Sequence, residues 1–128
     1  MSEFYSFEGL RDGGTFVVDA TTKSTIEDDP KQIIGKVVTV TGNGEAGYGS
    51  SGDAPLGFVE MVEKENTNSE NLVISVVWHQ VREDIPASGV TAGDWVQCDG
   101  SGGVAKSSEP TGARALAFDT DKAIVQMY

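Results

Sequence analysis

The sequence contains only one cysteine, Cys98, and one histidine, His79, among its 128 residues. A single cysteine excludes an internal disulfide and any metal site that is built from several cysteines. Basic residues are also scarce, with 9 Lys and Arg against 20 Asp and Glu and a formal net charge of −11. Affinity for phosphate backbones comes from Lys and Arg that release counterions. We therefore expect no nucleic-acid partner and no anionic membrane partner.

Long hydrophobic runs are absent as well, and none approaches the roughly 18 residues that a membrane-spanning helix needs. The first ten residues carry Glu3 and Glu8 and have no basic region. An ordinary secretory signal begins with positive charge and continues into an apolar stretch. The sequence thus predicts a soluble protein that is not exported by such a signal.

Glycine is abundant, with 16 residues that punctuate short runs rich in valine, isoleucine and aromatic side chains. This pattern is typical of an all-β protein built from short antiparallel strands and hairpins. We expect a compact small β-barrel or β-sandwich. The predicted strands are residues 15–20, 36–41, 56–63, 72–82, 94–98, 103–106, 113–118 and 123–128, with turns at 42–44, 66–69, 99–102 and 119–122. A single helical turn is predicted where Asp29 precedes Pro30.

The segment 72–82 alternates in a way that makes both of its faces apolar. Leu72, Ile74, Val76 and Trp78 share one face of the predicted strand. The opposite face contains Val73, Val77, His79 and Val81. Two interpretations follow: a central strand buried between two layers, or a strand whose second face forms a subunit interface. The second interpretation makes Val73, Val77, His79 and Val81 the candidate oligomer contact.

Residues 1–30 differ in composition from the rest, because aromatic side chains and glycines are interleaved with seven acids and only two basic residues. Such a mixture cannot close a core of its own. We expect an extended N-terminal arm over residues 1–30 and a single β-rich body over residues 31–128. The candidate docking residues of the arm are Phe4, Tyr5, Phe7 and Phe16. The alternative is that these aromatics pack back onto the body.

The sequence contains no complete catalytic or cofactor-binding motif. Residues 42–47 match the G-x-G-x-x-G pattern, but the glycine- and proline-containing segment that follows cannot open the helix that a dinucleotide site requires. No Gly-x-Ser-x-Gly elbow occurs. His79 lies in an apolar strand and Cys98 follows Trp95 and Val96, so both are interpreted as packed residues. We expect no catalytic, cofactor-binding or metal-binding residue and no enzyme.

The order of several turn-and-strand segments resembles the small capsid decoration, or cement, proteins of tailed bacteriophages. The resemblance covers about residues 30–128. It rests on the segments 35–40 (GKVVTV), 52–59 (GDAPLGFV), 90–96 (VTAGDWV), 112–118 (GARALAF) and 123–127 (AIVQM).

The resemblance implies a non-enzymatic structural protein on the exterior of a phage virion, made in the host cytoplasm. It implies binding to the major capsid protein, often as a homo-trimer, and stabilisation of the head. An arm could add a strand to an exposed sheet edge of the capsid. Two other classes stay open on the residues alone. One is a carbohydrate-binding β-sandwich with Trp78, Trp95 or Tyr48 as a stacking platform, and the other is an acidic DNA mimic.

Overall fold

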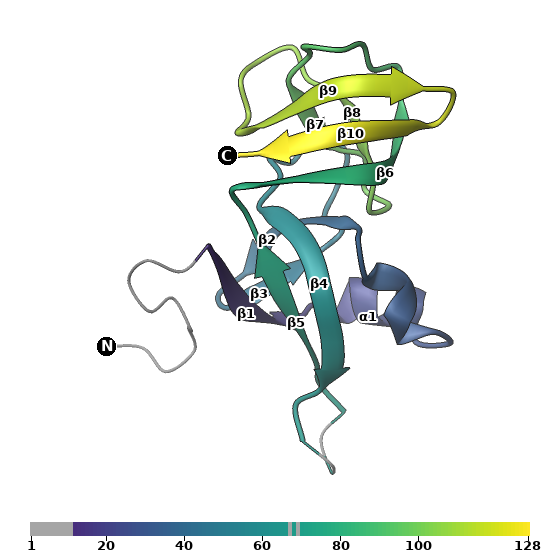
Figure 1. The fold of residues 1–128 in the computed structure, drawn as a ribbon. Coiled ribbons are helices and arrows are strands. Elements are labelled where there is room, and N and C mark those ends of the chain that lie inside the picture. Colours follow the sequence, from purple (N-terminus) through teal and green to yellow (C-terminus); the bar gives the residue numbers. More distant parts are fainter. Residues whose placement is uncertain (1–11, 67, 69) are drawn as a thin grey trace.

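The structure is a computed structural model, and it describes residues 12–66, 68 and 70–128 (Figure 1). The prediction of a β-rich barrel is confirmed, since the strands form one closed barrel and one second, curled sheet. The described residues contain one α-helix, α1 (Ala20–Ile26), and one short 3-10 helix, η1 (Pro30–Ile33). The strands are β1 (Gly13–Val18), β2 (Val37–Gly42), β3 (Glu45–Gly47), β4 (Gly57–Lys64), β5 (Leu72–Val77), β6 (Gln80–Ser88), β7 (Val96–Cys98), β8 (Val104–Lys106), β9 (Ala113–Asp119) and β10 (Lys122–Met127).

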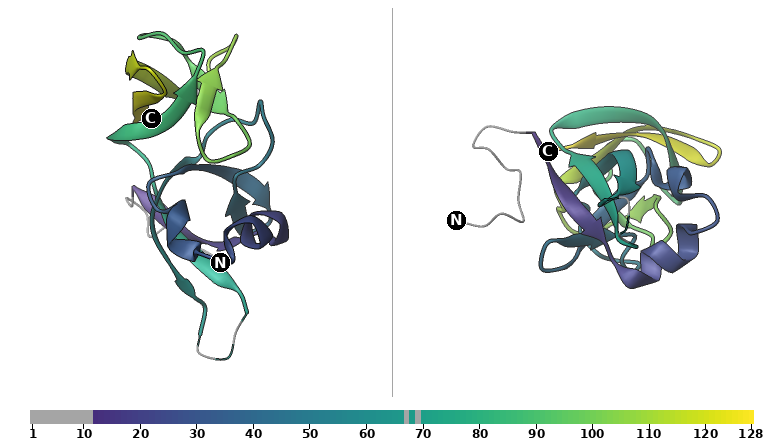
Figure 2. Two further views of the ribbon diagram at one scale, coloured as in Figure 1. Left: turned by 90° about the vertical axis from the view of Figure 1, so that its right-hand side faces the viewer. Right: turned by 90° about the horizontal axis from the view of Figure 1, so that it is seen from below.

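The closed barrel has the strand order β1-β3-β2-β4-β5, and β5 returns to pair with β1. All pairs are antiparallel except β1 with β3, which are parallel. The left view of Figure 2 looks into this ring of strands. The barrel interior contains one apolar cluster that includes Phe16, Ile26, Ile33 and Ile74. Helix α1 and η1 therefore contribute directly to the core of the barrel.

The second sheet has the order β7-β8-β6-β10-β9 and curls into a half-barrel. The hairpin β9–β10 at one edge of this sheet is antiparallel and turns at Thr120, which has a φ of 61°. Side chains alternate along β10, so that Ala123, Val125 and Met127 are buried against the half-barrel core. Figure 1 shows this sheet stacked on one end of the closed barrel.

Strands β2 and β4 form a wall that both cores share. Val37 pairs with Phe58, and both side chains belong to the half-barrel cluster. Their neighbours Val38 and Val59 belong to the barrel cluster. All four side chains are completely buried. Because successive residues of a strand point to opposite faces, one pair of strands can close both cores. The half-barrel therefore rests on the barrel rather than forming a separate unit.

The prediction of one continuous strand over residues 72–82 is wrong, because the segment forms two strands. β5 ends at Val77 in the barrel, and β6 begins at Gln80 in the half-barrel. Between them His79 has a φ of 59°, a left-handed conformation that breaks the extended backbone. Trp78 packs against both apolar clusters at this crossing. The two apolar faces of the segment thus serve two different sheets.

The boundary expected at residue 30 also differs from the structure. Residues 13–18 are the strand β1, which pairs with β5 from Gly13 to Val17 and with β3. Helix α1 follows at once, because Asp19 accepts a hydrogen bond at Oδ1 from the Thr22 backbone N–H and caps the first turn. Residues 13–30 therefore belong to the folded body, and an arm can include only residues before β1.

Several local predictions are confirmed. The Gly42-Asn43-Gly44 turn joins the antiparallel pair β2 and β3, with Gly44 at a φ of 73°. The turn at 99–102 joins β7 and β8. Pro30 opens a single helical turn, although it is of the 3-10 type and Asp29 makes no side-chain cap bond. Helix α1 was not predicted, since its threonine-rich sequence has weak helix propensity and its cap was interpreted as part of an arm.

The shared wall predicts an unusually severe effect of one substitution. Phe58→Ala removes a buried ring that also lies 5.9 Å from the Arg82 guanidinium carbon. We expect a loss of about 3–5 kcal/mol of unfolding free energy in urea denaturation, with both sheets melting together. Leu116→Ala is the control, because Leu116 is 43% exposed and should cost far less. Equal losses in the two variants would contradict the shared wall.

Candidate interaction surface

The solvent side of strands β6, β10 and β9 exposes large apolar side chains. Val81 is 51% exposed, Leu116 is 43% exposed and Tyr128 is 49% exposed. Val81 is in register with Gln126, which is in register with Arg114. Their neighbours Ala113, Ala115, Val125 and Met127 are buried in the half-barrel core. We call the surface made by Val81, Arg114, Leu116, Gln126 and Tyr128 together with Trp95 the outer face.

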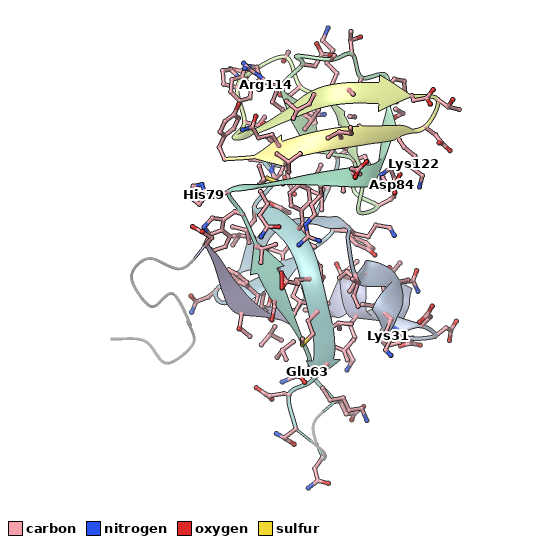
Figure 3. The ribbon with its side chains drawn as sticks, in the orientation of Figure 1. Lys31, Glu63, His79, Asp84, Arg114 and Lys122 are labelled. Carbon is pink, nitrogen blue, oxygen red and sulfur yellow. The ribbon has the colours of Figure 1, made fainter. Side chains whose placement is uncertain are left out.

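An aromatic and cationic cluster lies on this outer face. The Arg114 guanidinium carbon is 4.3 Å from the centroid of the Trp95 ring, within cation–π range. The Trp95 and Tyr128 ring centroids are 6.1 Å apart at an interplanar angle of 53°. A β-bridge between Trp95 and Arg114 fixes the two backbones. Figure 3 shows Arg114 on the half-barrel, above the crossing that carries His79.

Arg114 has an unusual environment for a cation in an acidic protein. Its Nε atom is buried and has no hydrogen-bond partner among the residues that the structure describes. A buried donor without a partner costs free energy, and a group of this kind calls for an explanation. Trp, Tyr and Arg are also the residues that dominate binding energy at protein interfaces. The side chains of the cluster are therefore of the kinds that are found at the centres of protein interfaces.

The residues predicted as an oligomer contact lie on two sheets. Val73 and Val77 are half-buried on β5 of the barrel, and Val77 packs against the half-barrel core. His79 is exposed at the crossing between the sheets. Val81 is exposed on β6 and belongs to the outer face. The structure therefore does not bring all four residues onto one strand face, although Val81 remains available for contact.

The predicted docking residues of the arm have different positions. Phe4, Tyr5 and Phe7 lie outside the residues that the structure describes. Phe16 is on β1, is only 6% exposed and belongs to the barrel core. The prediction that Phe16 is a docking residue is therefore corrected, because its ring is already buried by β1, β4 and β5 neighbours.

Cys98 is a buried thiol on β7. It is 1% exposed, and burial raises its pKa to about 12, with a smaller contribution from the Asp53 and Asp99 carboxylates. A reactive thiol needs a lowered pKa and access to solvent. Cys98 has neither property, so the structure gives it the role of a core residue.

Metal sites and membrane-spanning helices are two further possibilities for the described residues. They contain no group of three His, Cys, Asp or Glu side chains that could hold a metal ion. They also contain no helix long and apolar enough to cross a membrane. The G-x-G-x-x-G segment comprises the last residue of β2, the turn after it and strand β3. It offers no helix to a dinucleotide.

Comparisons with known proteins add no relative. No protein-family model, no curated protein and no solved structure matches the chain.

Sequence reasoning missed the cluster on the outer face. Trp95 and Arg114 are 19 positions apart and have no spacing that predicts contact. The available signal was the alternation along residues 113–118, which places Arg114 and Leu116 on the face opposite to Ala113 and Ala115. Without the pairing of Trp95 with Arg114, that signal could not identify a surface.

The raised pKa of Cys98 predicts a dependence of stability on alkaline pH. The folded thiol keeps its proton up to about pH 12, whereas the unfolded thiol ionises from about pH 9. The unfolded state is thus favoured as the pH rises between these values. The stability of the wild type relative to Cys98→Ala should fall above pH 9, by up to about 1.4 kcal/mol per pH unit.

The measurement is urea denaturation of both proteins at several values between pH 7.5 and 10.5. Other alkaline groups titrate equally in the two proteins, so they cancel in the difference. A difference that is constant over this range would show that the native thiol ionises normally.

Proposed function

We propose that this chain is a structural protein of a tailed bacteriophage that binds the outside of the capsid and stabilises the head. It acts without catalysis, as a decoration or cement protein on the virion exterior, after synthesis in the host cytoplasm. Its partners are the major capsid protein and further copies of itself. The proposal rests on the sequence resemblance and on the way the resembling segments fold.

The main supporting observation is that these segments pack together although they are scattered over 93 positions, from 35 to 127. The segments 35–40 and 52–59 are joined by backbone hydrogen bonds from Leu56 N to Val38 O and from Val59 N to Lys36 O. The segments 90–96 and 112–118 are joined in the same way, through Gly93 N to Ala115 O and Ala115 N to Asp94 O. Each of the five segments contributes side chains to the half-barrel cluster. The segments that carry the resemblance therefore build a single hydrophobic core.

Self-association is proposed through the outer face. It combines exposed apolar side chains with the Trp95–Arg114–Tyr128 cluster, and such anchors are typical of interface centres. Val81 is the residue of the original candidate set that lies on it. Closed symmetry is the rule for homo-oligomers, and the resemblance favours three copies.

Capsid docking is proposed through the segment before β1. Its aromatic residues Phe4, Tyr5 and Phe7 are the candidate anchors. The described part of the chain begins at Asp12, whose backbone carbonyl accepts a hydrogen bond from the Trp78 N–H at 2.8 Å. An arm ordered on binding loses about 1–2 kcal/mol per residue, so only large side chains can offset this loss.

The capsid proposal predicts the effect of the triple substitution Phe4→Ser, Tyr5→Ser and Phe7→Ser. We expect loss of binding to expanded capsids assembled from the major capsid protein of the phage that encodes this chain. Co-sedimentation and electron microscopy of the capsids measure binding, and a thermal melt checks the fold. The control is Phe118→Ser, which leaves the arm unchanged while perturbing the body.

Wild-type decoration by the triple variant would contradict the docking role of the arm. Failure of the unmodified protein to bind these capsids, or absence of a neighbouring capsid gene, would contradict the function itself.

The self-association proposal predicts that Val81→Asp separates the oligomer. The new carboxylate would be buried without a partner in the contact, which strongly disfavours association. Light scattering coupled to size-exclusion chromatography should give a trimer for the wild type and a monomer for the variant. Val40→Asp is a matched control, since Val40 is 56% exposed on β2 of the barrel. A wild type that is monomeric at micromolar concentration would overturn this proposal.

A further inference from the structure

A polar pocket of about 470 Å³ lies beside the closed barrel, away from the outer face. Helix α1, η1, the end of β2, the loop after β3 and the β7–β8 turn all contribute to it. Side-chain hydroxyls of threonine, serine and tyrosine dominate its lining. This volume is within the range of small-molecule sites. Segments that are distant in the sequence thus build one hydroxyl-rich surface.

Asp19 lies in the pocket wall with its carboxylate held in place. Its Oδ1 atom accepts a hydrogen bond from the Thr22 backbone N–H at 2.8 Å. Its Oδ2 atom accepts one from the Thr41 hydroxyl, also at 2.8 Å. Gly47 lies against it, and a side chain at that position would collide with the carboxylate. A carboxylate has about four acceptor sites, so Asp19 is both fixed and able to accept further hydrogen bonds.

Tyr48 lines the same pocket and is only 7% exposed. Its backbone N–H donates to the Thr22 hydroxyl at 3.0 Å. The phenol hydroxyl makes no hydrogen bond with any residue of the described chain. Burial raises its pKa, so it stays a protonated donor. The ring is held in place, since a side chain at Gly102 would come within 2.8 Å of it. The hydroxyl is thus a donor that no described residue uses, at a pocket surface where a ligand oxygen can accept its hydrogen bond.

The charge of the pocket indicates the class of ligand. Among the described residues that line it, Lys36 and Asp19 are the charged ones, one of each sign. Lys36 is already engaged, because its Nζ donates to the Gln32 carbonyl at 3.1 Å. A protein of net charge −11 disfavours anions, and a balanced pocket gives no strong attraction for cations. Hydroxyl donors and acceptors around a fixed carboxylate favour a neutral molecule that is itself rich in hydroxyls.

We propose that this pocket binds a small neutral saccharide. Asp19 accepts hydrogen bonds from sugar hydroxyls, and the Tyr48 phenol donates to a sugar oxygen. The inference does not rest on the phage proposal, since it uses only the geometry beside the barrel. It shares Tyr48 with the stacking platform expected at Trp78, Trp95 or Tyr48, but it uses the Tyr48 hydroxyl and the Asp19 carboxylate in place of ring stacking.

The experiment is a glycan array that contains neutral and sialylated glycans, followed by titration of a neutral hit in ¹H–¹⁵N NMR spectra. We expect binding of neutral glycans, with amide shifts concentrated at Thr22, Tyr48 and Ser101. Tyr48→Phe removes only the hydroxyl and should weaken binding about three- to tenfold. Ser88→Ala is the control, because it removes an exposed hydroxyl outside the pocket and should leave the affinity unchanged.

Three results would overturn the proposal. The first is no neutral glycan bound at millimolar concentration in either assay. The second is preferential binding of sialylated glycans, which would contradict the neutral class. The third is evidence that the glycan binds elsewhere. Either an unchanged affinity in Tyr48→Phe or amide shifts that map to Trp95 and Arg114 would provide it. Chemical-shift agreement between the free variants and the wild type verifies that the substitutions preserve the fold.

Discussion

The packing of two adjacent β-strands on both of their faces is the constraint on which the rest of this structure depends. Val37 and Phe58 close the half-barrel core, while Val38 and Val59 close the barrel core from the same backbone. A chain of this length has limited apolar surface to bury. Sharing one wall lets two small sheets complete two cores without a third layer. The stability of each sheet therefore depends on the other.

The shared wall also requires the chain to pass from one sheet to the other at a defined point. It does so between β5 and β6, where Trp78 contacts both cores and His79 adopts a positive φ. A positive φ at a residue other than glycine is uncommon and persists only when the surroundings impose it. Here the surroundings are the barrel pairing before Trp78 and the half-barrel pairing after His79. A turn that looks irregular locally is thus set by packing on both sides.

The two surfaces proposed for binding differ in the chemistry that builds them. The outer face of the half-barrel is apolar and aromatic around a single arginine, which suits a protein partner. The pocket beside the barrel is lined by hydroxyls around a fixed carboxylate, which suits a hydroxylated small molecule. They use different strands, so a second copy bound at the outer face would leave the pocket open to a ligand.

Local chemistry alone determined the β class, the hairpin turns and the turn at Pro30, because glycine placement and alternation act over a few residues. Tertiary structure decided the rest. Residues 72–82 alternate like one strand, yet packing against two cores divides them. Phe16 looks like part of an acidic arm, yet pairing with β5 buries it. The contact of Trp95 with Arg114, and the placement of Asp19 and Tyr48 in one pocket, depend on packing between distant segments. Such contacts are set by the closure of the sheets, which no short-range pattern encodes.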